Sequence, residues 1–205
     1  MLAQRAMLGG GVAGKAAAEV AAGLGSDVTI LDINTERLHY LNDVMAPNVA
    51  TLYSSSEAIA SLLPQCDIVV GTVLIPGAKA PKLITRGMLK NMKPGSVLVD
   101  VSIDQGGCVE TSRPTTLDQP TFLRHCVVHY CVPNMTANVP RTASRVLTNA
   151  ALPYVKALAK LGVSGAIRAD SALARGIYMF RGTMVHERLG DHFGIPTTNL
   201  NDLLD

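Results

Sequence analysis

The chain has 205 residues, which is enough for one α/β domain and a modest extension. Apolar residues make up 48% and charged residues 17%, a composition typical of a globular protein and not of a disordered one. The formal net charge of +2 is too small to favour a nucleic-acid partner or an anionic membrane surface. No apolar run approaches the roughly 18 residues that a membrane span needs.

The N-terminus and the cysteines indicate the compartment. The first residues lack the apolar core and cleavage pattern of a secretory signal. The four cysteines contain no C-x-x-C pair, so we expect reduced thiols, a cytoplasmic location and no metal site.

The most informative motif lies close to the N-terminus. Gly9, Gly11 and Gly14 form a G-x-G-x-x-G pattern, and the apolar run 28–31 ends in Asp32. Asp32 follows Gly14 by 18 residues, close to the spacing of about 20 at which an acid bonds a dinucleotide ribose. We therefore expect a dinucleotide site; a glycine turn that serves packing alone is the alternative.

The pattern that follows alternates strands and helices. We expect strands at 5–8, 28–31, 49–52, 67–73, 96–101 and 127–132, and helices at 15–25, 34–43, 55–64 and 85–92. This order predicts an α/β fold, a Rossmann-type doubly wound parallel sheet. The alternation of strands and helices stops near Pro140, so we expect a nucleotide-binding domain at 1–140 and a helical extension at 141–205. In the extension, helices are expected at 142–161, interrupted by Pro153, at 166–173 and at 184–192.

The functional loops should follow the strands, because ligands of such sheets bind beyond the carboxyl ends. Asp32 favours NAD over NADP, since a carboxylate repels a 2′-phosphate, although Arg37 could receive a phosphate. Asp104 follows a buried strand; its carboxylate faces either the nicotinamide or its own backbone in an Asx turn. Cys108 fits a packed residue better than a nucleophile. Asn134 is either a turn cap or a group that bonds a ribose or carboxamide.

Other polar residues fit ordinary structural places. Lys79 and Lys82 lie in a loop rich in Pro and Gly, where solvation is the common outcome and ligand contact the alternative. His125 and His129 alternate with apolar residues and are expected to be strand side chains. Arg113 is expected in an exposed loop, from which it could reach a phosphate or carboxylate.

Several strings resemble the NAD-binding and C-terminal part of NAD-dependent alanine dehydrogenases. They are the glycine motif with 28–34, P-G-A-K-A-P-K-L at 76–83, I-D-Q-G-G-C at 103–108, S-R-P-T-T at 112–116 and L-T-N-A at 147–150. The resemblance covers essentially the whole chain. It implies hydride transfer to NAD in the oxidative deamination of L-alanine to pyruvate and ammonia, and a homo-oligomer, a hexamer in the family.

The resemblance also implies roles for particular residues. Asp104 corresponds to the catalytic acid–base carboxylate beside the nicotinamide. The implied cofactor-binding residues are Gly9, Gly11, Val12, Ala13, Gly14, Asp32, Arg37, Ser54, Val73, Leu74, Val101, Ser102, Ile103, Asp104, Arg113, Val132, Pro133, Asn134 and Met135.

The chain departs from the family pattern in two respects. Pro133 and Thr136 stand where the family usually has Ala and Pro, which affects the turn on the nicotinamide side. The substrate-clamping Arg and Lys and the catalytic His of the family belong to an N-terminal domain without a counterpart in this sequence. We therefore expect an N-terminally truncated form that binds NAD, completed by a separate N-terminal polypeptide if active. The alternatives are a nucleotide-binding subunit of a transhydrogenase-like assembly and an inactive fragment.

Overall fold

The computed structural model describes residues 3–204. The chain divides into two compact units, Met1–Met135 and Thr136–Asp205. The sequence-based boundary at residue 140 lies a few residues beyond this division.

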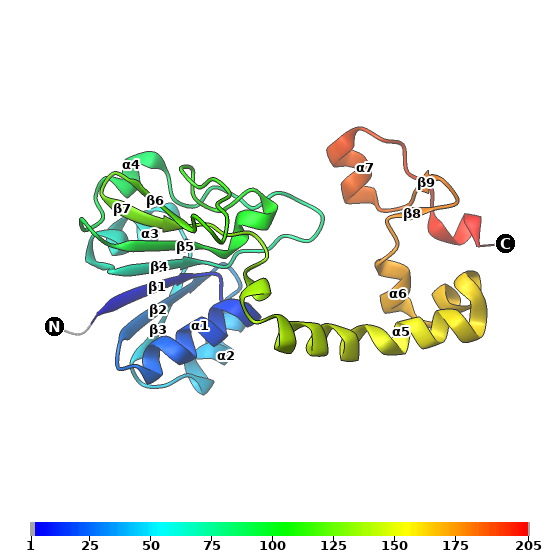
Figure 1. Ribbon diagram of the computed structural model, residues 1–205, viewed down its shortest axis with the longest axis horizontal. Helices are drawn as coiled ribbons and strands as arrows, with labels where there is room; N and C mark the ends of the chain where they lie inside the picture. The colour runs from blue at the N-terminus through cyan, green and yellow to red at the C-terminus, as the bar shows by residue number, and fades with distance from the viewer. Residues whose placement is uncertain (1–2, 205) are drawn as a thin grey trace. The chain divides into compact units, whose positions relative to one another are not determined.

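The first unit is built on a sheet of seven strands among the described residues (Figure 1). The order across the sheet is β3-β2-β1-β4-β5-β7-β6. All neighbours pair in parallel except β6, which is antiparallel to β7. The Rossmann-type fold class is thereby confirmed. The strands are β1 (Gln4–Leu8), β2 (Asp27–Asp32), β3 (Val49–Tyr53), β4 (Ile68–Gly71), β5 (Val97–Asp100), β6 (Thr121–Arg124) and β7 (Val127–Tyr130).

Three of the connecting helices begin at residues whose side chains cap them. Helices α2, α3 and α4 are N-capped by Asn34, Ser55 and Thr85, whose side-chain oxygens accept backbone N–H groups three residues on. Helix α4 is shorter than the helix expected through Met92. The bounds are α1 (Val12–Gly23), α2 (Thr35–Val44), α3 (Ser56–Leu62), α4 (Arg86–Leu89), and the 3₁₀ turns η1 (Leu63–Gln65) and η2 (Val101–Gln105).

Two hydrophobic cores lie on opposite faces of the sheet, because successive strand residues point to alternate sides. In β1, Met7 packs with α1, α2 and β2, whereas Ala6 and Leu8 pack with α3, η1 and α4. Each of these β1 side chains is 1% exposed. The central strand therefore packs against both layers, and the glycine turn begins at its carboxyl end.

The antiparallel strand β6 was not predicted. It reaches β7 through a turn at His125 and Cys126, whose φ values of 49° and 61° lie in the left-handed region. Both residues are exposed, so His125 is a turn residue and its expected place in a strand is wrong. His129 is the buried strand residue that was expected.

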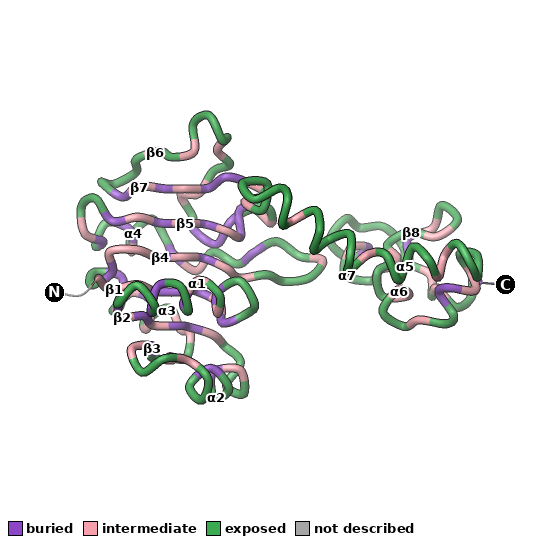
Figure 2. The backbone as a smooth tube through the Cα atoms, turned by 60° about the horizontal axis from the view of Figure 1, so that its bottom comes forward, coloured by how far each residue is buried: buried purple, intermediate pink, exposed green. Residues whose placement is uncertain are grey.

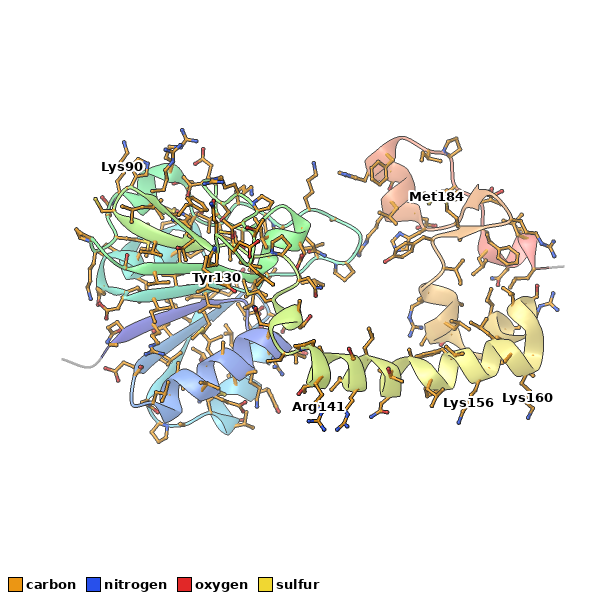
Figure 3. All side chains as sticks on the ribbon, viewed as in Figure 1. Lys90, Tyr130, Arg141, Lys156, Lys160 and Met184 are labelled. Atoms are coloured by element: carbon orange, nitrogen blue, oxygen red, sulfur yellow. The ribbon has the colours of Figure 1, made fainter. Side chains whose placement is uncertain are left out.

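The second unit is mainly helical. Helix α5 (Pro140–Ala169) runs through Pro153 without leaving helical geometry, and the backbone departs from it at Gly162 (φ 69°, ψ 174°). The expected interruption at Pro153 is therefore wrong. Most of α5 is exposed within the unit (Figure 2). The helix carries no acidic residue, and Arg141, Lys156 and Lys160 project on one side of it (Figure 3).

The remaining elements of this unit are short. Strands β8 and β9 form an antiparallel pair that was not expected, and they lie between the last two α-helices. The turn η3 (Met135–Asn138) begins at the last residue of the first unit. The other bounds are α6 (Ser171–Arg175), β8 (Met179–Phe180), β9 (Thr183–Met184), α7 (Glu187–Phe193) and η4 (Leu200–Leu203).

Candidate functional site

A cleft of about 820 Å³ opens at the carboxyl ends of β1, β2, β4 and β5. This is where a doubly wound sheet binds ligands. Every residue that lines it belongs to the first unit. Eleven of the residues expected from the sequence are among them: Gly9, Gly11, Val12, Ala13, Asp32, Ser54, Val73, Leu74, Val101, Ser102 and Asp104.

The glycine turn packs too tightly for side chains at Gly9 and Gly14. Gly9 has φ 104°, and its N–H donates to the Leu31 carbonyl oxygen at 2.8 Å. A Cβ added to Gly14 would lie 1.9 Å from the Gly9 carbonyl oxygen and 2.8 Å from Thr72 Oγ1. These two glycines are therefore explained by contacts within the protein.

Gly11 differs from its neighbours in the motif. A Cβ built on Gly11 would meet nothing within 4 Å, and the residue lies exposed at the cleft. Gly11 also occupies the N-cap position of α1, where no side chain caps the helix and no acidic residue stands in the first turn. The positive end of α1 thus meets the cleft uncovered, and this arrangement suits an anionic group.

Asp32 and Arg37 hold the peptide groups of Gly10 from both sides. Asp32 Oδ2 accepts the Gly10 N–H at 2.7 Å, and Asp32 Oδ1 accepts the Asn34 N–H at 2.9 Å. Arg37 Nε donates to the Gly10 carbonyl oxygen at 2.6 Å, and its guanidinium lies over the Tyr40 ring. Arg37 does not line the cleft, whereas Asp32 does.

Asp104 lies exposed at the cleft on the 3₁₀ turn η2, which directly follows β5. Its Oδ1 accepts the backbone N–H of Asn134 at 3.0 Å. Asn134 has φ 51°, so the turn after β7 adopts a left-handed conformation that aims this N–H at η2. Two loops that are distant in the sequence therefore meet at this carboxylate.

A second carboxylate, Asp100, lies buried beneath η2. It accepts the N–H groups of Cys108 and Val109 at 3.0 and 3.3 Å and the Ser112 hydroxyl at 2.6 Å. With 0% exposure, Asp100 holds the segment after η2 to the end of β5. Sequence reasoning missed this role, because a single acid at the end of a strand gives no sign of its burial.

The buried thiols and His129 are structural. Burial raises the pKa of the Cys108 thiol to about 12, and the neighbouring Asp100 adds to the effect. This environment favours the packed thiol over the nucleophile. His129 is held between the Thr111 hydroxyl and the Val127 carbonyl and stacks on Phe122. Burial lowers the pKa of His129.

The other expected site residues lie outside the cleft lining. Gly14 and Ile103 are buried beneath it, and Arg113 lies over the Phe122 ring, 4.4 Å from the centroid. Val132, Pro133, Asn134 and Met135 form the turn after β7 that reaches Asp104. Their roles toward a cofactor remain predictions. The lining also contains residues that the sequence did not single out: Leu31, Ile33, Thr72, Ile75, Pro81, Leu83 and Gln105.

Residues 2–187 match the family described as "Alanine dehydrogenase/PNT, C-terminal domain". The chain belongs to this family. The alanine dehydrogenase of Mycobacterium tuberculosis (strain H37Rv) is 47% identical over 192 residues, covering 94% of this chain and 52% of the relative. The chain thus spans about half the length of the curated relatives it matches. Membership of the family implies NAD as the cofactor of this fold.

Solved structures agree with this assignment. An L-alanine dehydrogenase superposes with a TM-score of 0.84 at 45% identity, covering 94% of this chain and 53% of that one. The transhydrogenase from Sinorhizobium meliloti gives a TM-score of 0.56 at 31% identity, covering 63% of this chain and 36% of that one. The chain is therefore more similar to the L-alanine dehydrogenase structure than to the transhydrogenase structure. Among residues 3–204, no helix is long and apolar enough to cross a membrane.

Proposed function

We propose that this chain binds NAD in the cleft and serves as the cofactor-binding part of an alanine dehydrogenase, which converts L-alanine, water and NAD to pyruvate, ammonia and NADH. The NAD proposal rests on the surroundings and position of Gly11. No protein atom occupies the space that a side chain at Gly11 would take, and the residue lies in the cleft at a helix N-terminus without a side-chain cap. A pyrophosphate fits both features.

The remaining residues have roles consistent with this placement. The backbone N–H groups of Val12 and Ala13 would bind the pyrophosphate, and the Asp32 carboxylate would accept ribose hydroxyl groups. Ser54 would lie near the adenine, with Val73, Leu74 and Val101 lining the cleft toward the nicotinamide. NAD, when bound, supplies the hydride acceptor. Asp104 would hold or move a proton beside it, and its carboxylate is held in place by the Asn134 N–H.

The charged residues of the cleft do not suit a substrate that carries a carboxylate. Asp32 and Asp104 are the charged residues in its lining, and both are acidic. A substrate with a carboxylate needs a cationic partner to hold it in line for hydride transfer. We therefore propose that turnover of alanine requires cationic groups from outside this cleft. The homo-oligomer, the separate N-terminal polypeptide and the cytoplasmic location stay predictions.

The proposed site is tested by measuring NAD affinity calorimetrically for the wild type and for Gly11→Ala. The added methyl group meets no protein atom, so the melting temperature should stay unchanged while NAD affinity falls about tenfold or more. Gly23→Ala is the matched control, because a Cβ at Gly23 also meets nothing within 4 Å and Gly23 ends the same helix. Equal NAD affinity in both variants, or no NAD binding by the wild type, would contradict the proposal.

The need for cationic groups from outside the cleft is tested by mixing the chain with NAD and L-alanine and following NADH absorbance. We expect binding of NAD without sustained turnover. Rapid turnover by the chain alone would contradict the need for external cationic groups, while leaving the NAD site intact.

A further inference from the structure

The loop between β4 and α4 forms one wall of the cleft through Leu74, Ile75, Pro81 and Leu83, and η2 forms the adjoining wall through Asp104 and Gln105. Most of the loop lacks regular secondary structure, so its position relative to η2 depends on a small number of contacts. They include the Leu83 and Ile84 N–H groups, which donate to the Cys108 carbonyl oxygen at 2.8 and 3.3 Å, and the Ser102 hydroxyl, which donates to the Val73 carbonyl oxygen at 2.8 Å. Lys82 and Gln105 add side-chain contacts to these.

Lys82 reaches across to the segment that follows η2. Its Nζ donates to the carbonyl oxygens of Gly106 at 2.5 Å, Gly107 at 2.7 Å and Val109 at 3.4 Å. An ammonium group has three donors, and all three find an acceptor here. The side chain was expected to be solvated or to touch a ligand. Lys82 is exposed in the structure, and its ammonium group also lies against a cradle of backbone carbonyls.

The cradle depends on the conformation of the two glycines. Gly106 and Gly107 have φ values of 88° and 77°, a left-handed pair that turns the chain sharply at the end of η2. Their N–H groups close η2 by donating to the Ile103 and Ser102 carbonyls at 3.0 and 2.9 Å. Gly106 and Gly107 thus close η2 with their N–H groups and bind Lys82 with their carbonyl oxygens.

Gln105 forms a second connection between the same two segments. Its side-chain Oε1 accepts the Ile75 N–H at 3.3 Å, and its backbone carbonyl accepts the Ala80 N–H at 2.9 Å. Gln105 therefore holds both ends of the exposed part of the loop. Pro81 and Leu83 flank Lys82 and also line the cleft, so the two connections act on the wall of the cleft, together with the hydrogen bond from the Leu83 N–H to the Cys108 carbonyl oxygen.

We propose that Lys82 is a positioning residue for the cofactor site: its ammonium group acts as a built-in cation that fixes the loop of residues 73–83 against the turn carrying Asp104. This inference rests on the proposed NAD function for its effect on affinity, but not for its effect on local order. Without the ammonium group, the carbonyl oxygens of Gly106 and Gly107 lose this donor, and the loop is held to η2 only by Gln105, Ser102 and the backbone of Leu83 and Ile84.

The first test measures local order without any cofactor. Amide hydrogen exchange of the Lys82→Met variant should be faster in peptides covering 73–84 and 104–110, and unchanged in the strands β1 and β2. Lys79→Met, an exposed lysine of the same loop, is the matched control and should exchange like the wild type. Wild-type exchange in Lys82→Met would overturn the proposal, whether or not the chain binds NAD.

The second test uses chemical rescue. In Lys82→Ala the carbonyl cradle is open to a small cation, so ammonium ions should restore slow exchange and NAD affinity, whereas tetramethylammonium at equal ionic strength should not. We expect NAD binding to weaken about tenfold in Lys82→Ala, with partial recovery in Lys82→Arg. If the wild type binds NAD and Lys82→Ala binds it equally well, the positioning role is wrong. If the wild type does not bind NAD, the proposed function is wrong and the exchange data alone decide on Lys82.

Discussion

Arg37 donates from Nε to the carbonyl oxygen of Gly10, 2.6 Å away, and so holds the glycine turn from behind. This contact gives the arginine a task that does not involve a 2′-phosphate. It also links the residue to the position of Gly11, the next residue in the chain.

We expect Arg37→Ala to weaken NAD and NADP binding by the same factor, roughly fivefold to tenfold, because the loss acts through the turn. Calorimetric titration with both cofactors measures the two factors. Arg86→Ala, at an exposed arginine in α4, is the control and should leave both affinities unchanged. A loss confined to NADP would instead show that Arg37 receives a phosphate.

Asp100 and Asp104 lie at the two ends of the same short segment but differ in burial. Replacing Asp100 by Ala leaves two buried N–H groups and the Ser112 hydroxyl without their acceptor, so we expect the free energy of unfolding to fall by about 3 kcal/mol or more. Asp104→Ala should change it by about 0.5 kcal/mol or less, since Asp104 is exposed. Urea unfolding of both variants provides the measurement, and similar losses would contradict this assignment.

The thiols should differ in their reaction with a thiol reagent at neutral pH. Burial raises the pKa of Cys66 to about 11 and that of Cys108 to about 12, and it also raises the pKa of Cys131. Cys126 is exposed. We expect one fast-reacting thiol in the folded chain and four in urea, counted by absorbance. Cys126→Ser should abolish the fast phase, and a fast phase that survives this substitution would locate a reactive thiol elsewhere.

His129 should make stability depend on pH. Burial lowers its pKa in the folded state, so the unfolded chain binds a proton first as the pH falls. The stabilisation is fully present above the unfolded pKa of about 6.5 and is lost as the pH falls toward the lower folded value. Urea unfolding at pH 7.5 and 5.5 should show a smaller difference for His129→Gln than for the wild type. His39→Gln, at an exposed histidine, should retain the wild-type difference.

Features that depend on neighbouring residues could be predicted from the sequence. The Asn34 and Ser55 caps act on N–H groups three residues along the chain, and the glycine turn and the acid at the end of β2 lie within one strand–helix–strand unit. Strand β6 was missed because three of its four residues are exposed, so it lacks the apolar pattern of a buried strand. Its turn at His125 and Cys126 also lacks the glycine that announces most hairpins.

Contacts between distant segments could not be predicted in the same way. The donors of Asp100 lie eight or more residues further along the chain, and the acceptors of Lys82 lie 24 or more residues away. Nothing in the local sequence distinguishes Lys82 from Lys79, which share a loop and a residue type. Their different places arise only when β4 and β5 pair and bring the loop beside Gly106.

All the walls of the cleft come from a single compact unit, between Gly9 and Gln105. On the proposed assignment of NAD to this cleft, we expect cofactor preference to reside in this unit alone. Fusing residues 3–135 to a different substrate-binding partner should leave the choice between NAD and NADP unchanged. The cofactor-binding unit and the substrate-binding partner could then be altered separately.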